Sequence, residues 1–241
     1  MRLPGWSYTA RVNILAIFAH PDDELGCAAT LAKHAARGDQ VTLVWTTSGE
    51  NASQFGDTAP DEVKRVREGH ARDVSEHLGV KYRLYDLGDT RLTGGRDEAL
   101  VLAALYAELQ PDALITWDDF NPHPDHRMTA KAVFDAITLA RIPKVVEEAA
   151  PGRGLSAHRK PVSFYQYVST ESGRPIVHVD VTGFEDKGAW AAEYYSAFYK
   201  WEFGSSGFLA ARTQAGRAVG VKFAERFTLR RSAHPPLDYL V

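Results

Sequence analysis

The sequence predicts an α/β fold in which a mostly parallel sheet is flanked by helices. Short apolar segments rich in branched residues, typical of buried parallel strands, recur between residues 12 and 117. Segments with helical spacing of apolar residues separate them, and such alternation is typical of right-handed βαβ units. From residue 143 onward the pattern is weaker. We therefore expect a Rossmann-like sheet followed by a less regular C-terminal third, as one domain over residues 1–241.

Four strands are expected in the regular part of the chain. Each is short, apolar and rich in branched or aromatic residues, as in buried strands. Their expected ranges are Val12–Ala19, Val41–Thr47, Tyr82–Leu87 and Ala113–Trp117.

Helices are expected after each of these strands. Apolar residues three and four apart predict Leu25–Arg37, Asp61–Leu78, Asp97–Leu109 and Met128–Ala140. Gly38 and Gly79 follow two of them directly, where glycine commonly ends a helix.

The last third is expected to begin with an irregular connection over residues 143–161, which is rich in Pro, Gly, Glu and Ala. Later segments follow in the order strand, turn, strand, helix, Gly/Ser-rich stretch, short helix and strand. The strands and the long helix are Phe164–Val168, Ile176–Val181, Lys187–Lys200 and Phe223–Leu229, with a turn at residues 173–175 and the Gly/Ser-rich stretch at residues 204–207.

Composition limits the possible partners. The 241 residues carry a formal net charge of −3 and are 44% hydrophobic, without the basic stripe that nucleic acid or an anionic membrane would need. The single Cys27 excludes an internal disulfide and a cysteine-based zinc site. Pro4 and Gly5 interrupt the N-terminal stretch, which argues against a signal peptide. We expect a cytoplasmic protein with a small-molecule substrate, and a homo-oligomer is compatible with the sequence.

A polar cluster, His20-Pro21-Asp22-Asp23-Glu24, follows the first strand directly. The carboxyl ends of parallel strands are where open α/β sheets bind ligands. His20 and Asp23 can point at one metal ion across a turn, which leaves Asp22 free for proton transfer. Alternatively, the acidic residues only cap and charge the helix that follows.

A second cluster, residues 121–126 with the sequence Asn-Pro-His-Pro-Asp-His, follows the fourth strand. Two strand ends at one edge of the sheet would thus bring together three imidazoles and three carboxylates. Two imidazoles and one carboxylate form a facial donor set that leaves metal positions open, as in catalytic zinc sites. Non-haem iron also favours this set, so the donors do not name the metal.

The two clusters resemble the motifs of the PIG-L/LmbE-like family of zinc-dependent N-acetylglucosaminyl deacetylases. That family carries AHPDDE after its first strand and HPDH after a later one, as this chain does at residues 19–24 and 123–126. The resemblance implies that His20, Asp23 and His126 bind one Zn²⁺ per chain, with Fe²⁺ as the alternative ion.

The resemblance also implies the catalytic residues. Asp22 matches the general base, and His123 matches the stabiliser of the tetrahedral intermediate, where a cationic imidazole would meet the growing oxyanion. Asp125 would orient or charge His123.

Arg67 matches a substrate-binding arginine within an Arg-x-x-Glu pattern, but His70 stands where that glutamate is usual. The alternative for Arg67 is a solvated helix face. Asn121 replaces a tyrosine that relatives acting on thiol precursors often carry.

The expected function is that of a metal-dependent hydrolase, which removes acetyl from an N-acetylated amino sugar or its conjugate by attack of metal-bound water. One alternative is an amidase acting on another amide, such as a thiol–sugar conjugate. A non-hydrolytic sugar- or nucleotide-binding Rossmann-like protein is a third interpretation. The absence of Gly-x-Gly-x-x-Gly after the first strand argues against nucleotide binding.

Overall fold

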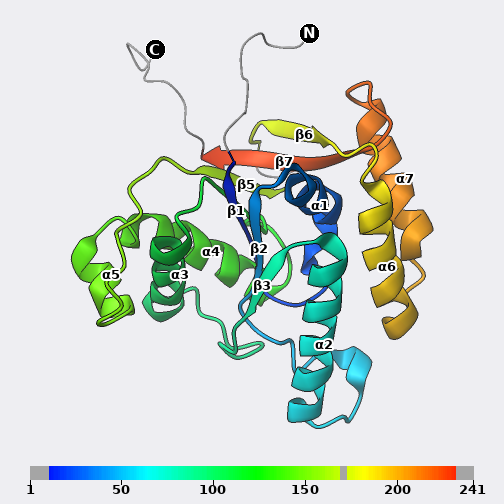
Figure 1. Ribbon diagram of the computed structural model, residues 1–241. Helices are drawn as coiled ribbons and strands as arrows, with labels where there is room; N and C mark the ends of the chain where they lie inside the picture. The colour runs from blue at the N-terminus through cyan, green and yellow to red at the C-terminus, as the bar shows by residue number, and fades with distance from the viewer. Residues whose placement is uncertain (1–10, 169–172, 232–241) are drawn as a thin grey trace.

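The computed structural model describes residues 11–168 and 173–231 (Figure 1). Residues 1–10, 169–172 and 232–241 lie outside the described part, and with them the residues that argue against a signal peptide. Every helix in the described ranges is too short or too polar to cross a bilayer.

Seven strands form one sheet in these ranges. They are β1 (Asn13–Phe18), β2 (Gln40–Trp45), β3 (Lys81–Leu84), β4 (Ala113–Thr116), β5 (Ser163–Tyr167), β6 (Ile176–Asp180) and β7 (Ala224–Arg231). Their order across the sheet is β3-β2-β1-β4-β5-β7-β6. The five strands from β3 to β5 are parallel neighbours, and β7 runs antiparallel to both β5 and β6. The prediction of an α/β fold with a mostly parallel sheet is confirmed.

Helices cover both faces of the sheet (Figure 1). They are α1 (Ala28–Arg37), α2 (Pro60–Leu78), α3 (Arg96–Leu109), α4 (Pro124–Leu139), α5 (Pro143–Ala149), α6 (Glu185–Tyr199) and α7 (Gly204–Arg217), with short 3₁₀ turns η1 (Asp23–Gly26) and η2 (Ser53–Phe55). In the view of Figure 1, α3, α4 and α5 lie to the left of the sheet, and α1, α2, α6 and α7 lie to its right.

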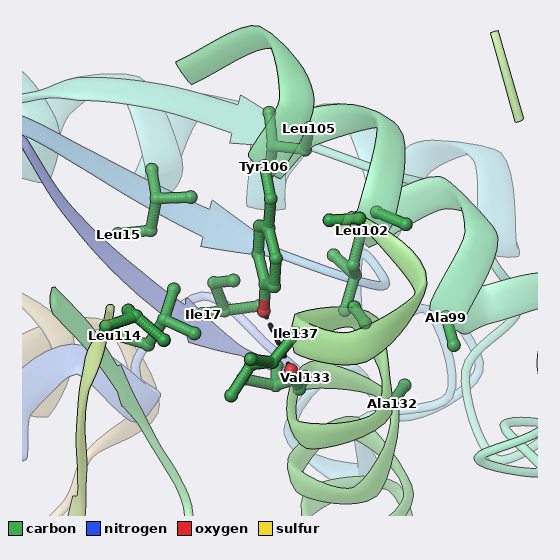
Figure 2. Close-up of a cluster of buried hydrophobic side chains, with 14 of the residues drawn as sticks. Leu15, Ile17, Ala99, Leu102, Leu105, Tyr106, Leu114, Ala132, Val133 and Ile137 are labelled. Carbon is green, nitrogen blue, oxygen red and sulfur yellow. Dashed lines mark hydrogen bonds between the residues drawn. The ribbon is translucent and has the colours of Figure 1, made fainter. Parts of the chain in front are cut away.

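Alternate residues of β1 supply the two cores, because successive side chains of a strand point to opposite faces. Leu15 and Ile17 pack with α3 and α4, where the Tyr106 hydroxyl donates to the carbonyl of Val133 (3.0 Å; Figure 2). Ile14 and Phe18 pack with α1 on the other face. Burial on both faces explains the continuous apolar character of this strand.

Helix α4 begins at Pro124, four residues before the predicted start at Met128. Proline suits the first turn of a helix, because its missing N–H would have no partner there and its φ is already helical. His123 is the N-cap, so Asp125 and His126 lie in the first turn of α4 rather than in a loop.

Two expectations for the last third are wrong. The stretch 143–161 is not wholly irregular, since α5 begins at Pro143 and buries Val146. The Gly/Ser-rich stretch 204–207 does not precede a short helix but forms the first turn of the 14-residue α7. In the sheet, β7 lies between β5 and β6.

Candidate metal and catalytic site

The segment after β1 is a tight turn that brings His20 and Asp23 to the carboxyl edge of the sheet. The backbone N–H of Asp23 donates to the carbonyl of His20 (3.2 Å), which closes the turn. Asp23 Oδ2 in turn accepts the backbone N–H groups of Ala19 and His20 at 3.1 and 2.9 Å. The Asp23 carboxylate is therefore fixed against the end of β1.

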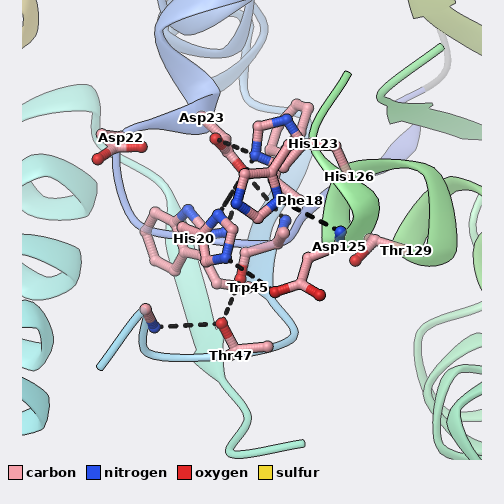
Figure 3. Close-up of polar contacts among 12 residues, drawn as sticks. Phe18, His20, Asp22, Asp23, Trp45, Thr47, His123, Asp125, His126 and Thr129 are labelled. Atoms are coloured by element: carbon pink, nitrogen blue, oxygen red, sulfur yellow. Dashed lines mark hydrogen bonds and ion pairs between the residues drawn. The ribbon is translucent and has the colours of Figure 1, made fainter. Parts of the chain in front are cut away.

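His20, Asp23 and His126 converge, as the sequence predicts (Figure 3). His20 Nδ1 lies 3.3 Å from His126 Nε2, which lies 3.3 Å from Asp23 Oδ1. His20 Nδ1 is 3.7 Å from Asp23 Oδ2. His20 and Asp23 are each only 7% exposed. One nitrogen of His123 also lies within 4.8 Å of the donor atoms of the other two histidines.

In His20 and His126, the ring nitrogen that points away from the other histidine also has a hydrogen-bond partner. His20 Nε2 lies 3.1 Å from Asp89 Oδ1 and 3.4 Å from Asp125 Oδ2. His126 Nδ1 lies 2.9 Å from Asn121 Oδ1. Carboxylate and amide oxygens only accept, so these ring nitrogens carry protons, and in a neutral ring the nitrogen that faces the other histidine is free to bind a metal.

Two ring nitrogens and a carboxylate oxygen at such short distances favour a positive charge among them, carried by a proton or by a metal ion. Burial by itself lowers the pKa of His20, but hydrogen bonds to Asp125 and Asp89 and the charge of Asp23 outweigh it and raise that pKa to about 10. The cluster thus attracts a cation, and its nitrogen and oxygen donors suit a divalent metal.

Asp22 lies apart from this cluster (Figure 3). Its Oδ2 accepts a hydrogen bond from Nη1 of Arg67 (2.9 Å). Burial raises the pKa of Asp22, against the opposing charge of Arg67. Arg67 is itself 3% exposed and also donates to the Pro21 carbonyl and the Tyr199 hydroxyl, so the alternative of a solvated helix face is wrong.

His123 differs from the cationic residue expected from the sequence. Its Nδ1 accepts the backbone N–H of Asp125 (3.2 Å), so Nδ1 carries no proton. Burial and the neighbouring His126 and His20 lower the pKa of His123. A neutral ring with its proton on Nε2 follows from both observations.

The carboxylate of Asp125 is directed elsewhere than expected. Its Oδ2 accepts the backbone N–H of Thr90 (2.7 Å) and faces His20 Nε2, and its contact with His123 is through the backbone N–H. The carboxylate of Asp125 therefore supports His20, and only the backbone of Asp125 orients His123.

These side chains line a cavity of about 400 Å³. All the residues predicted for the site border it except Asp125. The rest of the wall comes from the loop after β2, from the residues after β3 and from the segment after α6, namely Gly49, Asn51, Ala52, Ser53, Gln54, Asp89, Thr90 and Trp201.

Sequence reasoning missed Asp89, Trp117 and Trp201. Asp89 is 3% exposed and links His20 to the cavity wall, since its Oδ2 accepts the backbone N–H of Asn51 (2.8 Å). A polar residue after the third strand could have been noticed by the same rule that singled out the other two strand ends. No local signal distinguishes Trp201.

The fold and the site together define a class of protein: an α/β protein with an imidazole–carboxylate site at the carboxyl edge of its parallel strands. Residues 15–137, just over half of the chain, match the family model described as PIG-L: GlcNAc-PI de-N-acetylase. The chain belongs to this family, and the resemblance noted from its motifs is confirmed.

Two curated relatives carry deacetylase names. The 1D-myo-inositol 2-acetamido-2-deoxy-alpha-D-glucopyranoside deacetylase of Salinispora arenicola (strain CNS-205) is 32% identical over 172 residues, 58% of this chain and 54% of that protein. A probable N-acetyl-alpha-D-glucosaminyl L-malate deacetylase 2 of Bacillus anthracis is 31% identical over 147 residues, 55% of this chain and 61% of that protein. The chain thus matches less than two thirds of the length of either.

Solved structures share the fold over most of the chain. The N,N'-diacetylchitobiose deacetylase from Pyrococcus horikoshii has a TM-score of 0.78 at 22% identity, covering 91% of this chain and 84% of its own. GalB, the 4-carboxy-2-hydroxymuconate hydratase from Pseudomonas putida KT2440, has a TM-score of 0.72 at 22% identity, covering 95% and 99%. At this identity the likeness shows the fold alone.

Proposed function

We propose that this chain is a metal-dependent hydrolase that removes the acetyl group from an N-acetylated amino sugar or its conjugate. The observation that carries the proposal is the convergence of His20 Nδ1, His126 Nε2 and Asp23 Oδ1 beside a cavity that also holds Asp22. The names of the two curated relatives, both deacetylases of acetamido-sugar conjugates, support the substrate class.

His20, Asp23 and His126 would hold the cation, and we propose one Zn²⁺ per chain, because two imidazoles with one carboxylate form a catalytic zinc donor set. When bound, such an ion lowers the pKa of water towards neutrality and polarises a carbonyl group. Fe²⁺ accepts the same donors and is the alternative ion.

Asp22 would be the general base. It would take a proton from the attacking water and pass that proton to the departing amine. Burial raises the pKa of Asp22, which makes the carboxylate a stronger proton acceptor, and Arg67 holds it in place.

His123 would stabilise the negative charge that develops on the carbonyl oxygen. A neutral imidazole can donate its Nε2–H to that oxygen, while the N–H of Asp125 holds Nδ1. Arg67 borders the cavity. It would contact the sugar only through guanidinium N–H groups that are not bonded to Asp22.

The test is a measurement of amine and acetate release, with metal analysis of the purified chain. The panel comprises N-acetylglucosamine, its myo-inositol and malate conjugates, and a thiol conjugate. It also contains 4-carboxy-2-hydroxymuconate, because a hydratase shares this fold. Release of equal amounts of acetate and amine from an acetamido sugar, lost in His126→Ala, is expected. Hydration of the muconate without amide cleavage would contradict the proposal.

A further inference from the structure

Trp117, the residue directly after β4, touches two of the three proposed metal ligands in two different ways. Its indole Nε1–H donates to Asp23 Oδ2 (3.0 Å). Its ring stacks on the ring of His126, with centroids 4.1 Å apart and planes inclined by 6°. No other aromatic ring in the described residues stacks so closely on a proposed ligand.

The hydrogen bond from Trp117 decides which oxygen of Asp23 is available to a metal ion. With Trp117 added to the two backbone N–H groups of the turn, three donors occupy Oδ2. Oδ1 is then the oxygen that faces His126 Nε2, at 3.3 Å. Removing the indole donor would leave Oδ2 with the two backbone donors alone and would weaken the preference of the carboxylate for this orientation.

The second contact fixes the plane of the His126 ring. The hydrogen bond to Asn121 holds one ring nitrogen, but a single hydrogen bond leaves the ring free to tilt about it. A parallel indole face at van der Waals distance removes that freedom. Trp117 thereby acts on both ligands at once.

Trp117 is itself held from neighbouring strands. Its ring meets Phe18 of β1 and Tyr167 of β5 edge to face, at centroid distances of 6.1 and 4.7 Å. Its carbonyl accepts a hydrogen bond from Nε2 of Gln166 (2.8 Å). The sheet therefore sets where the indole stands.

We propose that Trp117 is a positioning residue that sets the metal affinity of the site by fixing the Asp23 carboxylate and the His126 ring. The inference rests on the proposed metal centre. Partners of this kind, which hold ligands without touching the ion, typically contribute 10- to 100-fold to metal affinity.

The experiment measures Zn²⁺ dissociation constants of the full chain by competition with a chromophoric chelator. Trp117→Phe keeps a ring on His126 and removes the N–H donor, and Trp117→Leu removes both contacts. Trp45→Phe is the matched control, because this fully buried indole donates to Glu24 at 3.1 Å and is not bonded to any proposed ligand.

We expect about tenfold weaker Zn²⁺ binding in Trp117→Phe and a larger loss in Trp117→Leu, with wild-type affinity in Trp45→Phe. The visible spectrum of the Co²⁺-loaded protein should change in both Trp117 variants and not in the control. Wild-type affinity in folded Trp117→Phe and Trp117→Leu would overturn the inference, as would an equal loss in Trp45→Phe.

Two further outcomes are separable. If wild type binds Zn²⁺ tightly and His126→Ala loses it while Trp117 variants do not, only the role of Trp117 is refuted. If wild type binds no divalent ion, the proposed metal centre fails and this inference fails with it. Should Trp117→Leu not fold, Trp117→Phe and Trp117→Tyr decide between the outcomes.

Discussion

The backbone of Asp22 has a φ of 119°, a left-handed value that residues other than glycine rarely adopt. This conformation lets adjacent side chains take different directions. The Asp23 carboxylate faces His126, while the Asp22 carboxylate reaches Arg67. Such strain persists only where surrounding contacts enforce it, and it is common at active sites.

Asp22→Asn should keep the metal and lower kcat by about 10²- to 10⁴-fold, because an amide cannot accept the proton of the attacking water. Asparagine tolerates the left-handed backbone, so the fold should be retained. Metal content and turnover measured on the same sample test this. Near wild-type turnover with metal bound would show that Asp22 is not the general base.

Arg67→Ala should lower kcat, and not only raise KM as a simple substrate contact would. The guanidinium holds the Asp22 carboxylate, and its removal leaves that partly buried group without its cation. Arg65→Ala is the control, two residues away on α2 with a side chain 72% exposed. A rise in KM with unchanged kcat would show that Arg67 only grips the substrate.

At the scale of elements, the contact between α2 and α6 encloses a histidine in aromatic rings. His70 is 4% exposed and meets four rings of α6 edge to face, those of Tyr194, Tyr195, Phe198 and Tyr199. Its Nδ1 lies 3.2 Å from the Tyr199 hydroxyl, which also contacts Arg67. Burial and the charge of Arg67 lower the pKa of His70 to about 4.

His70 should therefore make the folded protein less stable as the pH is lowered from 6.5 towards 4. In that range the unfolded chain binds a proton at His70 that the folded chain does not, so the contribution of this residue to the free energy of unfolding decreases by at most about 1.4 kcal/mol per pH unit. His70→Gln cannot titrate and should show a smaller pH slope. Denaturant unfolding at several pH values tests this, and equal slopes would contradict it.

The packing of α6 against α7 depends on Gly188. A Cβ placed there would lie 2.1 Å from Cζ of the buried Phe208, so the Phe208 ring or one of the two helices would have to move. Gly188→Ala should lower the free energy of unfolding by about 1–3 kcal/mol, the usual cost of overpacking.

Gly69→Ala in α2 is the matched control for Gly188. The nearest atom to its added Cβ is the end of the Arg72 side chain at 3.9 Å. Alanine there should stabilise the helix by about 0.5–1 kcal/mol. Effects of the same sign in both variants would show that helix propensity, and not the contact between helices, dominates at Gly188.

At the scale of the whole molecule, the site joins segments that are distant in the chain. His20 and Asp23 follow β1, Asp89 follows β3, and Asp125 and His126 belong to α4 after β4. A cation held there would connect these segments in the folded state only. Binding to the folded state alone stabilises it in proportion to the logarithm of ligand concentration over Kd.

A chelator should therefore lower the Tm of the purified protein, and added Zn²⁺ should restore it. At a hundredfold excess over Kd, the stabilisation is about 2.7 kcal/mol. His126→Ala should remain folded and lose this response. A thermal shift of wild-type size in that variant would show that the ion binds elsewhere.

The sequence by itself determined the fold class, the positions of the first four strands along the chain and the meeting of His20, Asp23 and His126. These features depend on local patterns and on one general rule, that the carboxyl ends of adjacent parallel strands share an edge. Where a motif directly follows such a strand, the place of the strand in the sheet largely determines where the side chains of the motif lie.

Only the tertiary structure decided the partners of those side chains. The pairing of Arg67 with Asp22, the support of His20 by Asp89 and the stacking of Trp117 on His126 join residues far apart in sequence. The same holds for β7, which pairs between β5 and β6 although it comes last in the chain. Such contacts depend on how whole elements pack, and no local pattern of residues specifies that packing.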